Sequence, residues 1–249
     1  MNNLTTKSIS ILSKLAFILL ITISATSCSY GERVKGNRIV ATEERGDIQD
    51  FNKISISAGL TAEITQGEKD FVEVEADENI LKYIITEVHN DKTLHIHWKK
   101  NISIRRFKKA VVHISMKTLR EVRASSGSDV KSMNVFKSEN IKLNASSGAN
   151  INIMIEATRV SLNASSGADI DIKGSTDRLN ADASSGADID ADKLIAQHVN
   201  ANASSAGDIS VHAVQSINAN ASSAGDIEYS GNPKETNNHE SSGGDVDKK

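Results

Sequence analysis

The 249-residue sequence predicts an all-β protein, a right-handed parallel β-helix (a β-solenoid) of about six rungs with an N-terminal β-rich capping region. Two observations support this fold class. Apolar and polar residues alternate from Phe51 onward, which is typical of half-buried strands. A Ser-Ser motif then returns at intervals of 18 to 21 residues, which is typical of stacked rungs. Right-handed winding is expected because connections between parallel strands are usually right-handed.

The N-terminus predicts an export signal rather than part of the fold. Lys7 and Lys14 precede the apolar run Leu15–Ile23, which is far shorter than the roughly 20 residues of a membrane-spanning helix. The only cysteine, Cys28, directly follows the small residues Ala25–Ser27. This arrangement resembles a bacterial lipobox, in which the cysteine is acylated and becomes the new N-terminus. The alternative is an ordinary signal peptide that contains a thiol, but an unpaired cysteine is unusual in an exported protein.

Four regions are therefore expected along the chain. They are a lipoprotein signal peptide (1–27), a flexible polar tether (28–47), a β-helical domain (48–229) and a polar C-terminal tail or cap (230–249). With Cys28 as the lipidation site, the protein is expected to be exported and held by its lipid in the bacterial cell envelope. We place it at the outer membrane, on a face that the sequence does not define.

Four alternating segments precede the repeat. Strands are expected within residues 53–67, 70–76, 92–98 and 109–116. In the first segment, one parity holds Ile54, Ile56, Ala58, Leu60, Ala62 and Ile64. Residues 77–88 are ambiguous, because Asp77 could cap a short helical turn that runs on into a strand.

Seven Ser-Ser pairs mark the expected corners of the solenoid. They begin at Ser125, Ser146, Ser165, Ser184, Ser204, Ser222 and Ser241. Around the third pair, Val160, Leu162, Ala164, Ala168, Ile170 and Ile172 share one parity and are expected to point inward. The glycine moves by one place between Ser166-Gly167-Ala168 and Ser205-Ala206-Gly207, which indicates a structural corner rather than a catalytic loop. Few apolar residues follow the last pair, so the tail either caps the solenoid or frays.

An aspartate follows almost every corner. The column comprises Asp129, Asp169, Asp188, Asp208, Asp226 and Asp245, and Asn150 completes it. Stacked rungs would place these groups about 5 Å apart, where a cation would relieve their repulsion. Calcium-binding β-rolls use similar ladders, which makes Asp169, Asp188, Asp208 and Asp226 candidate ligands. Aspartate is also common in turns, and the sequence favours solvated corner residues with no metal or other cofactor.

Two other clusters precede the repeat. His95 and His97 share one face of an expected strand, but zinc needs further ligands that the sequence does not identify. A basic stretch could contact anionic lipid, polysaccharide or nucleic acid, or it could protect a hairpin edge from aggregation. Its residues are Lys99, Lys100, Arg105, Arg106, Lys108 and Lys109. The net charge of −3 gives no general attraction to nucleic acid, which is not an expected partner.

Two stretches resemble a known family. FNKISISAGLTAEITQGEKDFVEVEADENILKYIITEV (51–88) and LREVRASSGSDV (119–130) are similar to the head GIN domain, a putative auto-transporter adhesin domain of Bacteroidetes-type bacteria that often occurs in lipoproteins. The resemblance covers about residues 48–229. It implies a β-helical fold and an adhesive role, and it implies no catalytic residues. The chain departs from the family in having SSGAD or SSAGD where a plainer SGAGD is expected.

These features predict a non-enzymatic envelope protein that binds a surface, glycan or protein partner along a repetitive face. The alternative is a structural or envelope-stress accessory lipoprotein with no ligand of its own. No histidine recurs with the serines, so no catalytic serine is expected. A glycan hydrolase would need carboxylates beside aromatic sugar platforms, and aromatic residues make up only 4% of the chain.

Overall fold

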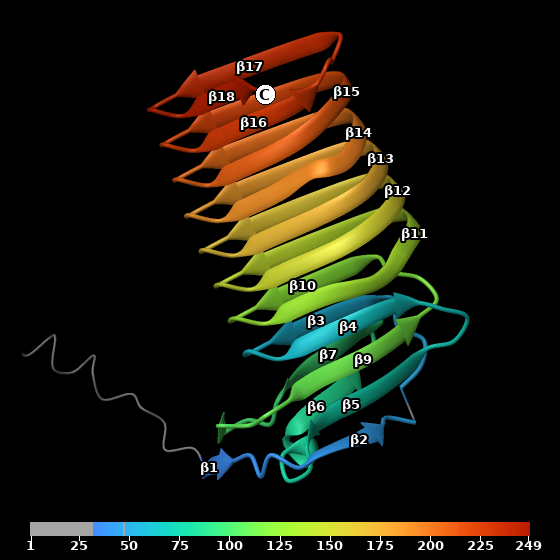
Figure 1. Cartoon of the computed structure of the whole chain (residues 1–249). Coiled ribbons are helices and arrows are strands. Elements are labelled where there is room, and N and C mark those ends of the chain that lie inside the picture. Colours follow the sequence, from blue (N-terminus) through green and yellow to red (C-terminus); the bar gives the residue numbers. More distant parts are fainter. Residues whose placement is uncertain (1–31, 47) are drawn as a thin grey trace, which may run out of the picture.

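The structure is a computed structural model that describes residues 32–46 and 48–249. These residues form an all-β solenoid of about seven turns, which confirms the predicted fold class (Figure 1). The expected signal peptide (1–27) and the expected lipidation site, Cys28, lie outside the described residues. No helix in the described ranges is long and apolar enough to cross a membrane.

Five long strands make the body of the solenoid, and each runs from one corner around the far side to the next corner. They are β11 (Asp129–Ser146), β12 (Asn150–Ser165), β13 (Asp169–Ser184), β14 (Asp188–Ser204) and β15 (Asp208–Ser222). Neighbouring strands pair in parallel, and the same repeat position stacks from rung to rung. Ala145 pairs with Ala164, for example, and Ala164 with Ala183. The prediction that equivalent repeat positions stack is therefore confirmed.

The interior combines large and small residues. Isoleucines such as Ile170 and Ile189 follow the corners, and alanines such as Ala164 and Ala183 lie directly before the serines. All belong to one buried cluster. Because small residues stand beside large ones, the narrow solenoid can be filled at the density that protein interiors need. All six residues predicted to point inward around Ser165 are buried.

Each corner turns the chain with two consecutive residues in the left-handed region. Between β12 and β13 these are Ser166 (φ 57°) and Gly167 (φ 65°). Between β14 and β15 they are Ser205 (φ 52°) and Ala206 (φ 57°). The shifted glycine, Gly207, takes the inward position instead, where a Cβ would lie 2.7 Å from backbone atoms of the preceding rung. The corners are therefore defined by small residues and backbone hydrogen bonds, in agreement with a structural role.

An eighth corner lies before the serine repeat. Ala58 (φ 62°) and Gly59 (φ 70°) make the same turn between β3 (Lys53–Ser57) and β4 (Thr61–Gln66). β3 pairs in parallel with β10 (Glu121–Ser125) and β4 with β11, so these strands form the first complete rung. Ala58 shares the sequence parity of the buried Ile56 and Leu60, but the corner interrupts the alternation and leaves Ala58 exposed.

The strands between β4 and β10 form the N-terminal cap. β7 (Thr93–Trp98) and β9 (Ala110–Met116) extend the solenoid by parallel pairing with β3 and β4. β6 (Ile84–Val88) and β5 (Phe71–Asp77) then pair antiparallel with β7 and β9, and β2 (Val40–Glu44) pairs antiparallel with β5. The change of direction closes the lower end of the parallel stack and protects its edge.

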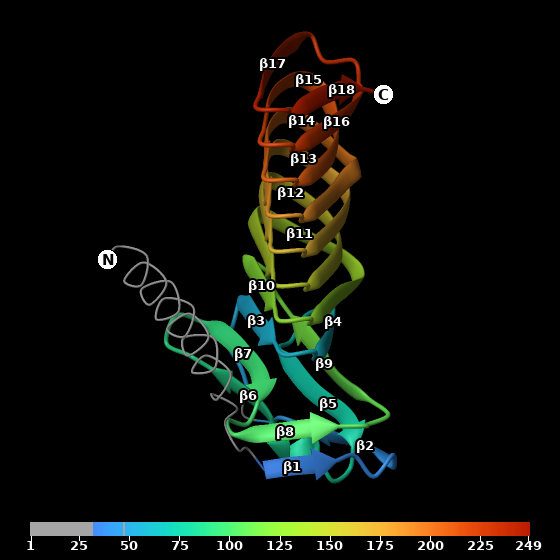
Figure 2. The ribbon, with the colours of Figure 1, turned by 90° about the vertical axis from the view of Figure 1, so that its left-hand side faces the viewer.

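The predicted flexible tether is wrong for the described part of 28–47. β1 (Glu32–Lys35) pairs in parallel with β8 (Ile102–Arg105), and Figure 2 shows both at the base of the cap. Val34 packs against the core. β1 is too short and too polar to show the alternation that marks the other strands, so its order depends on a partner that is distant in sequence.

The prediction that Asp77 caps a helix is also wrong. The short 3₁₀ helix η1 (Leu81–Tyr83) has no side-chain cap. The buried Asp77 carboxylate instead accepts backbone N–H groups of Arg38 (2.7 Å), Lys108 (2.9 Å) and Lys109 (3.2 Å). Burial alone would raise the pKa of this carboxyl, but the hydrogen bonds lower it below its ordinary value. Asp77 therefore connects the segment between β1 and β2, which contains Arg38, to the loop after β8, which contains Lys108 and Lys109.

The C-terminal tail forms a last rung. After β16 (Asp226–Gly231), β17 (Glu235–Ser241) stacks on β15, and β18 (Asp245–Lys248) stacks on β16. Every residue of β17 is exposed, whereas Val246 of β18 is buried. The sequence predicts that the tail either caps the solenoid or frays. It caps the solenoid, because its polar rung pairs with the last rung that has an apolar interior.

Candidate binding surface

One side of the solenoid is strongly acidic. Outward residues just after each corner form two neighbouring columns, here called the acidic face. The first contains the predicted aspartates, and the register pairs Asp169 with Asp188 and Asp188 with Asp208. The second lies two residues further along each strand, where Asp171, Asp190, Glu228 and Asp247 share a column with Lys131, Asn152 and Ser210. The predicted aspartate column is therefore confirmed, and a second acidic column accompanies it.

Repulsion and partial burial perturb this face. Burial raises the pKa of Asp188, and the charges of Asp169 and Asp208 raise it further. Burial and the neighbouring carboxylates raise the pKa of Asp226 in the same way. No three His, Cys, Asp or Glu side chains in the described ranges are arranged to hold a metal ion. The proposed calcium ladder of Asp169, Asp188, Asp208 and Asp226 thus has no coordination geometry in this structure.

The surface on the other side of the corners carries amides instead. Outward residues that precede each corner form two columns, here called the amide face. One column holds Arg123, Asn144, Asn163, Asp182, Asn202, Asn220 and His239. The other holds Lys142, Ser161, Asn180, Asn200, Asn218 and Asn237.

Hydrogen bonds connect these amides along the solenoid axis. The Asn202 Nδ2 donates to Asp182 Oδ1 (2.8 Å), and the Asn220 Nδ2 donates to Asn202 Oδ1 (3.0 Å). In the second column, Asn200 Nδ2 donates to Asn180 Oδ1 (3.1 Å). An amide both donates and accepts, so equivalent residues one rung apart can orient one another. The result is an ordered row of exposed donors and acceptors.

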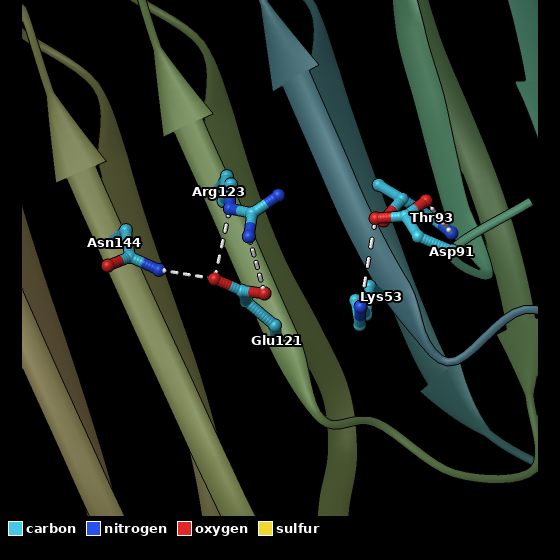
Figure 3. Close-up of polar contacts among 6 residues, drawn as sticks. All are labelled: Lys53, Asp91, Thr93, Glu121, Arg123 and Asn144. Carbon is cyan, nitrogen blue, oxygen red and sulfur yellow. Dashed lines mark hydrogen bonds and ion pairs between the residues drawn. The ribbon is translucent and has the colours of Figure 1, made fainter. Parts of the chain in front are cut away.

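At its cap end, the amide face ends in ion pairs (Figure 3). Arg123 donates twice to Glu121, from Nε to Oε1 (2.9 Å) and from Nη2 to Oε2 (2.8 Å), and Asn144 Nδ2 donates to the same Oε1 (3.0 Å). Lys53 lies 3.7 Å from Asp91 beside this cluster. Because Glu121 is only 8% exposed, these contacts satisfy a nearly buried carboxylate. The polar groups near the cap are thus engaged within the molecule.

Two hollows lie along the amide face. A hollow of ≈ 690 Å³ is lined in part by Arg159 and Asn180, and a second hollow of ≈ 400 Å³ is lined in part by Arg178, His198 and Asn200. Arg159 pairs with Arg178 and Asn180 with Asn200, so the hollows lie on neighbouring rungs of the same columns. These two hollows, here called the groove, therefore follow one another along the solenoid axis, with Arg159 and Arg178 beside Asn180 and Asn200.

His95 and His97 have neighbours that the sequence pattern does not reveal. The His89 ring lies 4.0 Å from that of His95 between centroids, and Glu87 Oε1 lies 3.2 Å from His89 Nε2 and 3.6 Å from His97 Nε2. Burial lowers the pKa of His95, and nearby His89 lowers it further. The β6–β7 hairpin brings these groups together, but within the described residues they do not form a three-ligand metal cluster.

Two serine–histidine contacts lack the order of a catalytic triad. His198 Nδ1 lies 2.9 Å from Ser216 Oγ, and His212 Nδ1 lies 2.9 Å from Ser230 Oγ. Ser230 Oγ donates to Asp192 Oδ1 (2.7 Å). In a triad the carboxylate orients the histidine, whereas here it holds the serine proton. Because Ser230 donates to Asp192, His212 does not accept the serine proton as the histidine of a triad does.

The predicted basic patch lies around β8 at the base of the cap. Five of its residues are exposed, namely Lys99, Lys100, Arg105, Arg106 and Lys108. Lys109 differs, because its Nζ lies 2.6 Å from Glu75 Oε2. The hydrogen bonds from Lys109 and His113 lower the pKa of the Glu75 carboxyl. Lys109 is thus part of a separate ion pair, and the other five residues form the patch.

The fold and its surfaces define a repetitive β-solenoid whose described residues present long, regular faces. The chain belongs to the family described as putative auto-transporter adhesin, head GIN domain, which matches residues 50–233. This finding confirms the resemblance in the sequence. Membership indicates an exported or cell-surface protein.

Several solved structures share the fold. A putative adhesin from Bacteroides fragilis aligns over 87% of this chain and 100% of its own, with a TM-score of 0.81 and 22% identity. A putative lipid binding protein from Parabacteroides distasonis covers 88% and 100%, with a TM-score of 0.73 and 23% identity. A putative adhesin from Parabacteroides merdae covers 88% and 99%, with a TM-score of 0.72 and 24% identity. No curated protein matches the chain.

Proposed function

We propose that this protein is a non-enzymatic adhesive lipoprotein of the bacterial envelope that binds an extended glycan, or a protein segment, along the groove of the amide face. The single observation that carries the proposal is the row of hydrogen-bonded amides beside that groove. Asn200 and Asn180, for example, are joined at 3.1 Å and line neighbouring hollows. Family membership supports the adhesive role.

The physical match to a polymer rests on periodicity and rigidity. Rungs repeat at about 4.8 Å, so a stretched ligand meets the same groups many times. Side chains that are already ordered lose less entropy on binding. Arg159 and Arg178 add positive charge beside the amides, which suits hydroxyl-rich chains that carry occasional acidic groups. Acylation at Cys28 would hold this surface at the membrane.

Glycan and matrix arrays probed with the acylated full-length chain test the proposal. The double variant Asn200→Ala, Asn218→Ala removes amides from the groove, and we expect it to weaken binding at least tenfold. Asp171→Ala with Asp190→Ala is a matched control on the acidic face, and it should bind like the unmodified chain.

Two results would contradict the proposal. Equal weakening by both double variants would show that the amide face is not the binding surface. No binding to any glycan or envelope protein would favour the alternative, an accessory lipoprotein without a ligand of its own.

A further inference from the structure

We propose that the base of the cap is a second, electrostatic membrane anchor, which docks on the anionic lipid headgroups of the membrane that holds the acyl chain. The basal surface consists of residues 32–39 and 99–108. Its exposed basic residues are Arg33, Lys35, Arg38, Lys99, Lys100, Arg105, Arg106 and Lys108. This inference rests on the proposed acylation of Cys28, but it is independent of what the amide face binds.

The first step is the distance between the lipid and the base. Glu32 begins β1, four residues after Cys28. At about 3.5 Å per extended residue, an acylated Cys28 can be no more than about 14 Å from Glu32. β1 pairs in parallel with β8 over its whole length, so the basic loop shares this position (Figure 2). A flexible tether over 28–47 would have allowed a reach of about 70 Å.

The second step is the charge of the base. Its two segments contain eight basic residues and one acidic residue, Glu32. Among the described residues, no carboxylate lies within 4.0 Å of any of these eight basic side chains, whereas Lys109 just beyond the segment pairs with Glu75. Each unpaired basic residue at an anionic membrane strengthens attachment by about fivefold.

The third step is the combination of charge and apolar groups. Ile39 is 61% exposed and Phe107 is 36% exposed, and both lie within the basal segments. Apolar side chains among lysines and arginines are typical of surfaces that enter the headgroup region. The acidic face would be repelled from the same membrane, which disfavours a solenoid lying on that side. Docking by the base therefore directs the C-terminal end and most of the amide groove away from the lipid.

Hydrogen–deuterium exchange of the acylated full-length chain in vesicles tests this inference. One preparation contains phosphatidylethanolamine with phosphatidylglycerol, and the other contains phosphatidylcholine alone. We expect amides of 99–108 to exchange at least tenfold more slowly in the anionic vesicles, with no change in β12–β15. An ionic strength of about 1 M, where the Debye length is about 3 Å, should remove the difference.

Two variants of equal charge provide the control. The basal variant carries Lys99→Gln, Lys100→Gln, Arg105→Gln and Lys108→Gln, and the solenoid variant carries Lys131→Gln, Lys142→Gln, Lys173→Gln and Lys193→Gln. Only the basal variant should lose the protection of 99–108. Unchanged exchange in β12–β15 verifies that each variant is folded.

The outcomes separate this inference from the lipoprotein proposal. A Cys28→Ala variant serves as the unacylated reference. If the unmodified chain is released from vesicles of both kinds, as this variant is, acylation is refuted, and the second anchor is refuted with it. If the chain stays with both but 99–108 exchanges equally in both, acylation stands and the basal anchor is overturned. Protection of this loop by a soluble anionic polysaccharide but not by anionic vesicles would also overturn it.

Discussion

The acidic face and the amide face are built on the same rungs, yet stacking has opposite effects on them. Asn202 donates to Asp182 and accepts from Asn220, so each contact orients the next. Asp188 instead has an aspartate on both neighbouring rungs, and its pKa is raised by burial and then further by these two charges. An amide has a donor and an acceptor, whereas an ionised carboxylate only accepts. A repeat therefore multiplies attraction in one column and repulsion in the other.

This difference suggests separate tasks for the two faces. The amide face is ordered before any ligand arrives, which is an advantage for binding. The acidic face opposes association with other acidic surfaces. Both faces depend on the shared core and on the register between rungs. Substitutions in the core and in each column can therefore measure how much each contributes to stability.

The largest effect is expected from the core beneath both faces. Ile189→Ala removes a fully buried side chain from β14 and should lower the free energy of unfolding by about 2–5 kcal/mol, because a cavity remains. Ile195 lies in the same strand but is 51% exposed, so Ile195→Ala should cost no more than about 0.5 kcal/mol. Urea unfolding followed by circular dichroism measures both. Similar costs would contradict the division into inward and outward columns.

A smaller effect is expected from converting the amide face into an acidic one. Asn202→Asp replaces the donor to Asp182 with a second negative charge and should cost about 1–2 kcal/mol at low salt. Asn202→Ala removes this hydrogen bond and the one that Asn202 accepts from Asn220, but it adds no charge, so its cost should be independent of salt. Thermal melts at low and high NaCl distinguish the two. A cost of Asn202→Asp that does not fall as NaCl is added would show that like charges in a column do not matter.

The smallest effect is expected from the reverse change, Asp188→Asn. Because the folded pKa of Asp188 is raised, its ionisation destabilises the fold as the pH rises above the ordinary value of 3.8, and this loss is absent below that pH. The variant should therefore be more stable at pH 7 by roughly half a kcal/mol after solvent screening, and the gain should vanish near pH 3.5. Asp77, whose pKa is lowered, has the opposite pH dependence in both proteins and cancels in the comparison. A pH-independent difference in melting temperature would refute the assignment.

Local patterns predicted the repetitive part of the fold well and its ends poorly. The inward positions of Ala164 and Ile170 follow from alternation, which is visible within a few residues. The corner at Ala58 and Gly59 has the same backbone as the later corners but lacks the Ser-Ser signature. β1 pairs with a strand about 70 residues away, and its four residues show no amphipathic pattern. For that reason an ordered edge strand was indistinguishable from a polar tether.

The candidate site was predicted only in part. The aspartate column follows from the repeat, because its members share one motif. The amide columns are less obvious, since Asn180, Asn200 and Asn218 stand in varied contexts and meet only through the register of the rungs. His89 approaches His95, and Glu87 approaches His97, because a hairpin folds back. No spacing along one strand could reveal these contacts.

The sequence by itself determined the strand-rich solenoid, its corners from Ser125 onward and its inward residues, because alternation and repeat length are properties of neighbouring residues. Only the tertiary structure decided that the tail caps the last rung, that asparagines join into a hydrogen-bonded face, and that the basic loop lies beside Glu32. Each of these depends on pairing between residues that are distant in sequence. The sequence defines each side chain, but the backbone hydrogen bonds between rungs decide which side chains become neighbours.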